Sequence, residues 1–271
     1  MIFGYRTLKM QESDIYSGNL ILINAQHAYR WNDKEHLVSV FERKNNTYKI
    51  RDKEILLDRA ALTALNDLMA DFGQNTTAEN DIGVVGGYRD IDRQRWFFET
   101  RVSSIGETEA IRWVAKPGYS EHHSGLAFDL KLYFDNGTAA DFLGKEQYTW
   151  VLKNCWKYGF ILRYPKNKTA ITKISYEPWH LRYVGIPHAM IMQKRGLCLE
   201  EYIDHLRNYQ LSSEYLRISY KRKAYKIYFT EGTSIRVPKA ENYELSGNNV
   251  DGFIVTTKKE TQKRFKKASK A

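Results

Sequence analysis

The chain has 271 residues, enough for one domain of about 200 residues and a small appendage. Hydrophobic residues make up 42% of the chain and aromatic residues 14%, which is ample for a packed core. No window reaches the ~18 apolar residues of a membrane span, so we expect no membrane-spanning helix.

The net charge of +10 would ordinarily suggest a nucleic-acid partner. Residues 258–271, however, carry seven Lys and Arg residues against one acid, which leaves only +4 for the rest of the chain. A polar, lysine-rich end of this kind is typical of a disordered tail. No nucleic-acid-reading motif accompanies it, so we expect no specific nucleic-acid partner.

Hydrophobic periodicity and turn residues predict the elements of residues 1–210. In chain order they are a strand at 20–23, a helix from the cap Asp58 to about Phe72, a strand at 82–85, a helix at 90–101, a strand after the turn Ser124–Gly125, a helix at 146–158, strands at 160–163 and 179–184, and a helix at 198–209. Helices mixed with strands indicate the α+β class.

Beyond residue 210 the pattern changes to an alternation of period two at 215–221, 224–229 and 233–237, with a further strand at 252–256. Gly232 and residues 246–249 mark turns. We therefore predict a small C-terminal β module at 211–257, too small to promise independent stability. Residues 258–271 form the predicted tail.

The segment 120–129, Ser-Glu-His-His-Ser-Gly-Leu-Ala-Phe-Asp, contains two candidate metal ligands. His122 and Asp129 are an odd number of residues apart, so an unbroken strand would send them to opposite faces. The turn at Ser124–Gly125 removes this conflict. After the turn, Asp129 lies on the face opposite the apolar side chains, and small Ala127 leaves room beside it for a metal.

The segment 177–180, Glu-Pro-Trp-His, supplies a third ligand and a base. Pro178 disfavours a helix, and the strand that follows carries His180. A catalytic zinc takes three ligands from His, Asp or Glu and leaves one position for water. Glu177, in the turn before the strand, is free to take a proton from water and return it to a leaving amine.

The other histidines have no comparable spacing. His123 is expected to be a structural neighbour of the site, and His27, His36, His188 and His205 are expected to be structural. Cys155 and Cys198 fit neither a metal site nor a redox pair and are expected to be reduced core thiols. The N-terminus has no signal-peptide pattern, and together these features predict a cytoplasmic protein.

The pattern Ser-x-His-x-x-Gly-x-Ala-x-Asp followed by Glu-x-x-His resembles that of the zinc D,D-peptidases of the VanX and VanY type. Residues 86–94, 159–165 and 174–185 agree, and the last two stretches resemble most closely the bifunctional VanXY-type enzymes. The resemblance covers roughly residues 18–210. Family members more often have Ser-Gly-Tyr-Arg-Ser at 86–90, so this chain departs at Gly86 and Asp90.

The resemblance implies a small antiparallel sheet flanked by helices, the zinc D-Ala-D-Ala peptidase or Hedgehog-like fold. It also implies roles for seven residues: His122, Asp129 and His180 as Zn²⁺ ligands, Glu177 as general base, Arg89 as the transition-state arginine, and Gln94 and Ser120 as substrate-binding groups. Chemistry supports Arg89 independently, because attack on an amide carbonyl builds an oxyanion that a fixed guanidinium stabilises.

The implied function is hydrolysis of the D-Ala-D-Ala dipeptide and of the C-terminal D-Ala of peptidoglycan precursor pentapeptides, which removes the targets of vancomycin-type antibiotics. Two enzymatic alternatives stay open: a soluble D,D-carboxypeptidase only, or an L,D-carboxypeptidase of peptidoglycan recycling. A zinc-binding module without catalysis is a third possibility. Glu177 argues against that module, because a purely structural site has no use for a base.

Overall fold

The computed structural model describes residues 4–240 and 242–260. A central six-stranded sheet has the order β3-β5-β6-β9-β8, with β7 paired to β6. The strands are β3 (Lys49–Ile50), β5 (Ile82–Gly86), β6 (Ala127–Tyr133), β7 (Ala139–Asp141), β8 (Phe160–Leu162) and β9 (His180–Tyr183). All pairs are antiparallel except β3 with β5. The predicted α+β class and antiparallel sheet are confirmed.

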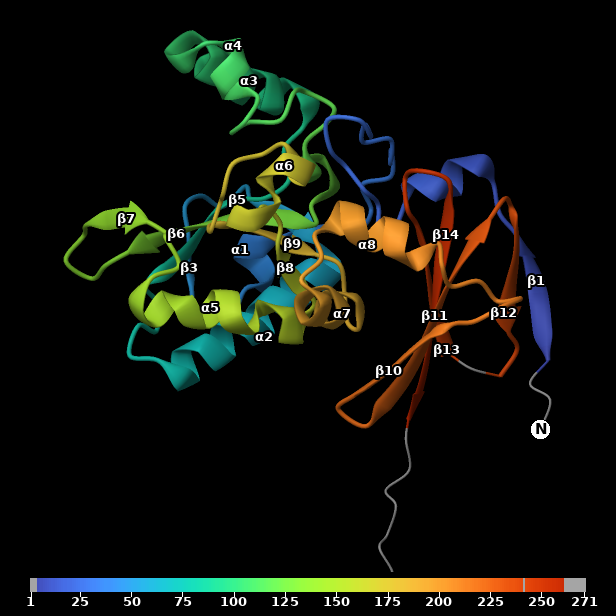
Figure 1. Cartoon of the computed structure of the whole chain (residues 1–271). Coiled ribbons are helices and arrows are strands. Elements are labelled where there is room, and N and C mark those ends of the chain that lie inside the picture. Colours follow the sequence, from blue (N-terminus) through green and yellow to red (C-terminus); the bar gives the residue numbers. More distant parts are fainter. Residues whose placement is uncertain (1–3, 241, 261–271) are drawn as a thin grey trace, which may run out of the picture.

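Helices cover this sheet and extend beyond it (Figure 1). The longer ones are α2 (Arg59–Asn75), α3 (Ile91–Ile105), α5 (Thr149–Asn154), α7 (His188–Arg195) and α8 (Leu199–Leu206). The short ones are α1 (Val40–Arg43), α4 (Glu107–Ala110) and α6 (Thr169–Thr172), and β2 (Leu37–Ser39) pairs with β4 (Leu56–Asp58). Among the described residues, no helix is long and apolar enough to cross a membrane.

Two helix starts follow directly from their cap residues. Asp58 accepts hydrogen bonds from the backbone N–H groups of Ala60 and Ala61, as its sequence position predicts. Asp90, one of the two departures from the family pattern, accepts from the N–H of Arg93. Serine and aspartate cap helices by the same contact, so Asp90 retains the capping function of the more usual serine.

The predicted helix at 146–158 is a composite. It consists of the 3₁₀ turn η3 (Glu146–Tyr148), α5, and the 3₁₀ turn η4 (Cys155–Tyr158). It ends at Gly159, whose φ of 89° lies in the left-handed region that glycine favours. Cys155 and Cys198 are buried and unbridged, as predicted.

The prediction of a strand at 20–23 is wrong. All four side chains are buried, but the segment forms no ladder. The N–H of Leu22 donates to the carbonyl of Asn248, and the N–H of Leu20 donates to the Ser246 hydroxyl. The continuous apolar run reflects burial on two sides, since Leu20 and Leu22 belong to one apolar cluster and Ile21 and Ile23 to another.

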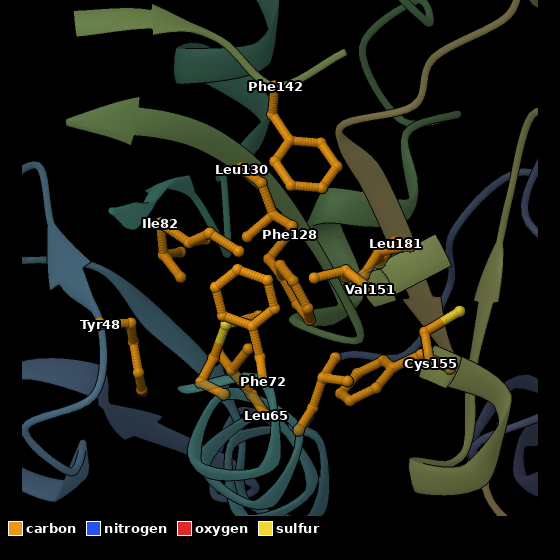
Figure 2. Close-up of a cluster of buried hydrophobic side chains, with 14 of the residues drawn as sticks. Tyr48, Leu65, Phe72, Ile82, Phe128, Leu130, Phe142, Val151, Cys155 and Leu181 are labelled. Carbon is orange, nitrogen blue, oxygen red and sulfur yellow. The ribbon is translucent and has the colours of Figure 1, made fainter. Parts of the chain in front are cut away.

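The main hydrophobic core lies between one face of the central sheet and the helices α2 and α5. Figure 2 shows Phe128 and Leu130 of β6 and Leu181 of β9 packed above Leu65 and Phe72 of α2. Successive strand residues point to opposite faces, so burial of these side chains directs Asp129 and His180 to the other face.

The C-terminal residues form a second antiparallel sheet, β10-β11-β14-β13. Its strands are β10 (Leu216–Tyr220), β11 (Lys223–Glu231), β13 (Asn242–Gly247) and β14 (Gly252–Glu260), while β12 (Ser234–Pro238) pairs with the N-terminal β1 (Tyr5–Lys9). Strand β13 was not predicted, and β14 runs three residues beyond the predicted module end. Residues 261–271 of the predicted tail lie outside the described residues, and the domain division at 210 stays a prediction.

This module shares a core with the helices beside it. Ile227 and Phe229 of β11 and Ile254 of β14 pack with Ile203 and Leu206 of α8. A buried histidine adds polar contacts to this interface. The ring of His188 in α7 lies 2.8 Å from the Tyr202 hydroxyl in α8 and 3.0 Å from the Thr256 hydroxyl in β14. The module is therefore supported by burial against the larger part of the chain.

Candidate active site

Three donor side chains meet on the face of the central sheet opposite the main hydrophobic core. Asp129 of β6 is directly opposite His180 of β9 on one side and Gly86 of β5 on the other. His122 comes from the 3₁₀ turn η2 (Glu121–Ser124), which ends at Gly125 with φ 67°. The spacing of His122 and Asp129 in the sequence predicts this turn. Glycine is needed at residue 125, because a Cβ there would lie 2.4 Å from a Leu37 methyl group.

The donor atoms of His122, Asp129 and His180 all lie within 4.8 Å of one another. His122 Nε2 is 3.3 Å from Asp129 Oδ2, and His180 Nδ1 is 3.1 Å from Asp129 Oδ1. The other ring nitrogen of His122 donates to the Gly87 carbonyl at 2.8 Å, which turns Nε2 toward the site. Two imidazole nitrogens and one carboxylate oxygen form a donor set of the kind that catalytic zinc uses, so these residues fit the metal.

The electrostatics suit two of these donors to metal binding. Burial lowers the pKa of His122 to about 4, so its ring is neutral at pH 7. Burial alone would raise the pKa of Asp129, but the neighbouring His122 and Arg89 hold it well below its usual range. Metal ligands must be deprotonated, and both groups already are.

Glu177 lies beside the three donors without joining them. Its backbone N–H donates to the Tyr164 carbonyl at 3.2 Å, and its Oε2 is 3.8 Å from His180 Nδ1. Burial raises the pKa of Glu177 to about 8. A carboxyl group whose pKa lies close to neutrality can both accept and return a proton.

Arg89 also reaches the site. Its Nη2 donates to Asp129 Oδ2 at 2.5 Å, and its guanidinium lies 4.6 Å from the centre of the Phe97 ring. The two histidines of η2 hold its backbone: the N–H of Arg89 donates to the His122 carbonyl, and His123 Nδ1 donates to the Arg89 carbonyl at 2.7 Å. The other ring nitrogen of His123, Nε2, accepts from the Gly118 N–H at 3.0 Å, so both of its ring nitrogens bond to the backbone and it is not one of the three donors.

A pocket of about 190 Å³ opens onto these groups. All seven predicted site residues line it: Arg89, Gln94, Ser120, His122, Asp129, Glu177 and His180. Sequence reasoning missed further lining residues, among them Arg101, Trp113, Tyr164 and Trp179. Tyr164 and Trp179 lie within the family-like stretches and could have been found there, whereas Arg101 and Trp113 belong to no motif.

Residues 54–186 match the family model VanY, D-alanyl-D-alanine carboxypeptidase. A D-alanyl-D-alanine carboxypeptidase of Enterococcus faecium is 36% identical over 251 residues, covering 90% of this chain and 77% of that protein. The chain belongs to the VanY peptidase family. The bifunctional D-Ala-D-Ala dipeptidase and carboxypeptidase VanXYC of Enterococcus gallinarum is 41% identical over 142 residues, 48% of this chain and 70% of that one.

A solved structure extends the match through both sheets. The vancomycin resistance D,D-dipeptidase VanXYg, solved with a D-Ala-D-Ala phosphinate analogue, superposes with a TM-score of 0.84 at 33% identity. The match covers 94% of this chain and all of that one. The resemblance to hydrolytic peptidases of the VanXY type is thereby confirmed, as is the fold it implied.

Proposed function

We propose that this chain is a zinc-dependent D,D-peptidase that hydrolyses the D-Ala-D-Ala dipeptide and removes the terminal D-Ala from peptidoglycan precursor pentapeptides. One observation carries the proposal: a His–Asp–His donor set, a buried carboxyl group and a guanidinium meet in one pocket. The match to VanXYg over both sheets favours the bifunctional activity over carboxypeptidase action alone.

The residues divide the chemistry between them. Zinc held by His122, Asp129 and His180 would polarise the scissile carbonyl and lower the pKa of the attacking water. Glu177 accepts the proton of that water and later donates it to the leaving amine of D-alanine. Arg89 places positive charge beside the carbonyl oxygen, where negative charge develops in the transition state.

Gln94 and Ser120 are suited to hold the substrate. Gln94 is 1% exposed, and its amide nitrogen donates to the Ala115 carbonyl at 2.8 Å. Its Oε1 is buried and has no hydrogen-bond partner among the described residues. A buried acceptor without a partner is costly, so a substrate N–H is a fitting donor for it. Ser120 also lines the pocket, and its hydroxyl oxygen accepts from the His122 N–H at 3.4 Å.

The test is D-alanine release from D-Ala-D-Ala and from a pentapeptide ending in D-Ala-D-Ala, with and without a chelator. We expect both to be cleaved and both activities to disappear with the metal. Cleavage of the pentapeptide with no detectable cleavage of the dipeptide would leave a D,D-carboxypeptidase. Preference for a tetrapeptide with an L,D bond would indicate the L,D-carboxypeptidase instead.

We further propose a cytoplasmic role that removes vancomycin targets, because the free dipeptide and nucleotide-linked precursors are made there. A precursor that resists the antibiotic must be spared for this role to succeed. We therefore expect little action on D-Ala-D-Lac or D-Ala-D-Ser ends. Comparable rates on these ends and on D-Ala-D-Ala would contradict the role.

A further inference from the structure

We propose that Glu121 is a positioning residue, whose carboxylate holds the His180 ring with Nε2–H pointing away from the metal position and Nδ1 toward it. The inference rests on the proposed ligand role of His180, but not on which peptide is hydrolysed. The motif Ser-x-His-x-x-Gly-x-Ala-x-Asp leaves the position of Glu121 unspecified and assigns it no task.

The orientation of the His180 ring is the first observation. Its Nδ1 faces Asp129, and its Nε2, on the far side of the ring, lies 3.5 Å from Glu121 Oε2. A neutral imidazole carries one N–H and one lone pair. Ligation through Nδ1 therefore requires the hydrogen on Nε2, where Glu121 is placed to accept it.

The two oxygens of Glu121 have different surroundings. Oε1 accepts from Arg163 Nε and Arg182 Nη1, each at 2.7 Å. Within the described residues, neither Glu121 Oε2 nor His180 Nε2 makes a hydrogen bond of ordinary geometry, and both atoms are buried. A buried donor or acceptor left unpaired costs about 1–3 kcal/mol. These two atoms face each other, so a small movement of the ring satisfies both.

The carboxylate is held by a buried ionic cluster that fixes its place. The side chains of Glu121, Arg163 and Arg182 are fully buried. Arg163 also makes two bonds to Glu200 of α8, at 2.7 and 2.9 Å. Arg182 donates to the backbone carbonyls of residues 19 and 21, at 3.1 and 2.9 Å. The two positive and two negative charges balance, and their hydrogen bonds hold the Glu121 carboxylate behind His180.

The two histidine ligands are thus supported differently. His122 is held by a neutral carbonyl, that of Gly87, whereas His180 is held by a carboxylate. A carboxylate that accepts the second N–H of a ligating histidine fixes its tautomer and raises its basicity. Loss of such a partner typically lowers metal affinity by about 10–100-fold.

The experiment is Glu121→Gln in the full chain. In this variant the guanidinium groups of Arg163 and Arg182 donate to the amide oxygen of the glutamine, so its NH₂ group faces His180 Nε2. An NH₂ donor there favours the His180 tautomer with its hydrogen on Nδ1, the atom that should bind the metal. We expect zinc affinity, measured by chelator competition, to fall about 10–100-fold. The absorption spectrum of the Co²⁺-substituted protein should also change. At saturating zinc, kcat should fall with little change in KM.

Glu200→Gln is the matched control, because it removes one negative charge from the same cluster without facing His180. We expect it to lower the unfolding temperature while zinc affinity stays close to that of the parent. Equal losses of zinc affinity in the two variants would mean that the cluster acts only through stability and would overturn the proposal.

Glu121→Asp keeps the test decisive if the glutamine variant does not fold. It retains the charge beside the arginines but withdraws the carboxylate from His180 by one methylene group. Zinc affinity within about twofold of the parent would overturn the proposal. Failure of the proposed function would look different, because peptide hydrolysis would then be absent in a parent that binds zinc tightly.

Discussion

Asp129 and His180 are paired directly across the antiparallel strands β6 and β9, with His180 Nδ1 3.1 Å from Asp129 Oδ1. Directly opposed residues project to the same face of a sheet. Strand register therefore places two of the three candidate metal ligands, and a slip of one residue would turn one of them into the core. The third ligand, His122, depends instead on the turn that ends at Gly125.

The first prediction concerns the metal. His122→Ala should remove zinc at near-stoichiometric supply, because it deletes one of three donors, while His123→Ala should retain it. Metal analysis of the dialysed proteins measures this, and anomalous scattering from crystals would locate the ion. Zinc loss in the His123 variant together with retention in the His122 variant would reverse the assignment.

The second prediction concerns the base. Glu177→Gln should keep fold and zinc but lower turnover by about 10²–10⁴-fold, the usual contribution of general acid–base catalysis. The loss of turnover is measured as the steady-state rate of D-alanine release, with the zinc content of each protein determined in parallel. Glu109→Gln, at an exposed position, is the control. Activity of the Glu177 variant within about threefold of the parent would require a different base.

The third prediction concerns Arg89. Arg89→Ala should lower kcat more than it raises KM, because contacts to the oxyanion strengthen as charge develops. Arg93 offers a matched control, since its guanidinium also lies over the Phe97 ring, at 5.1 Å. Arg93→Ala should leave kcat near that of the parent. A change confined to KM would make Arg89 a substrate-binding residue.

The fourth prediction concerns stability and pH. Burial lowers the pKa of His188 to about 3, below its ordinary value of 6.5. As the pH falls through 6.5, the unfolded chain binds this proton before the folded one, so the free energy of unfolding decreases. From about pH 7.5 to about pH 5.5, the loss from this group should be about 1.4 kcal/mol.

Urea unfolding of the metal-free parent and of His188→Gln at the two pH values measures this effect. Glutamine does not titrate, so the stability difference between the two proteins should narrow at the lower pH. A difference that stays constant would show that His188 does not contribute to the pH dependence.

Much of the site could be predicted from the sequence because its signals are local. The alternation around Asp129 separates a core face from a site face, and Ser124–Gly125 requires a turn between two ligands. The motif spacing also identified Glu177 as a group beside the metal position. These inferences need only the backbone geometry of a strand and a turn, which a few neighbouring residues determine.

Tertiary structure decided what depends on partners far apart in the chain. Residues 20–23 form an apolar run typical of a buried strand, yet the backbone N–H groups of Leu20 and Leu22 donate to Ser246 and Asn248, and no ladder forms. Strand β1 finds its partner in β12, more than two hundred residues away. The sequence alone assigns no role to Glu121, because only the folded chain buries its carboxylate against Arg163 and Arg182. Local sequence determines the direction of a side chain through strand and turn geometry. Only the packed fold determines which other side chains it contacts.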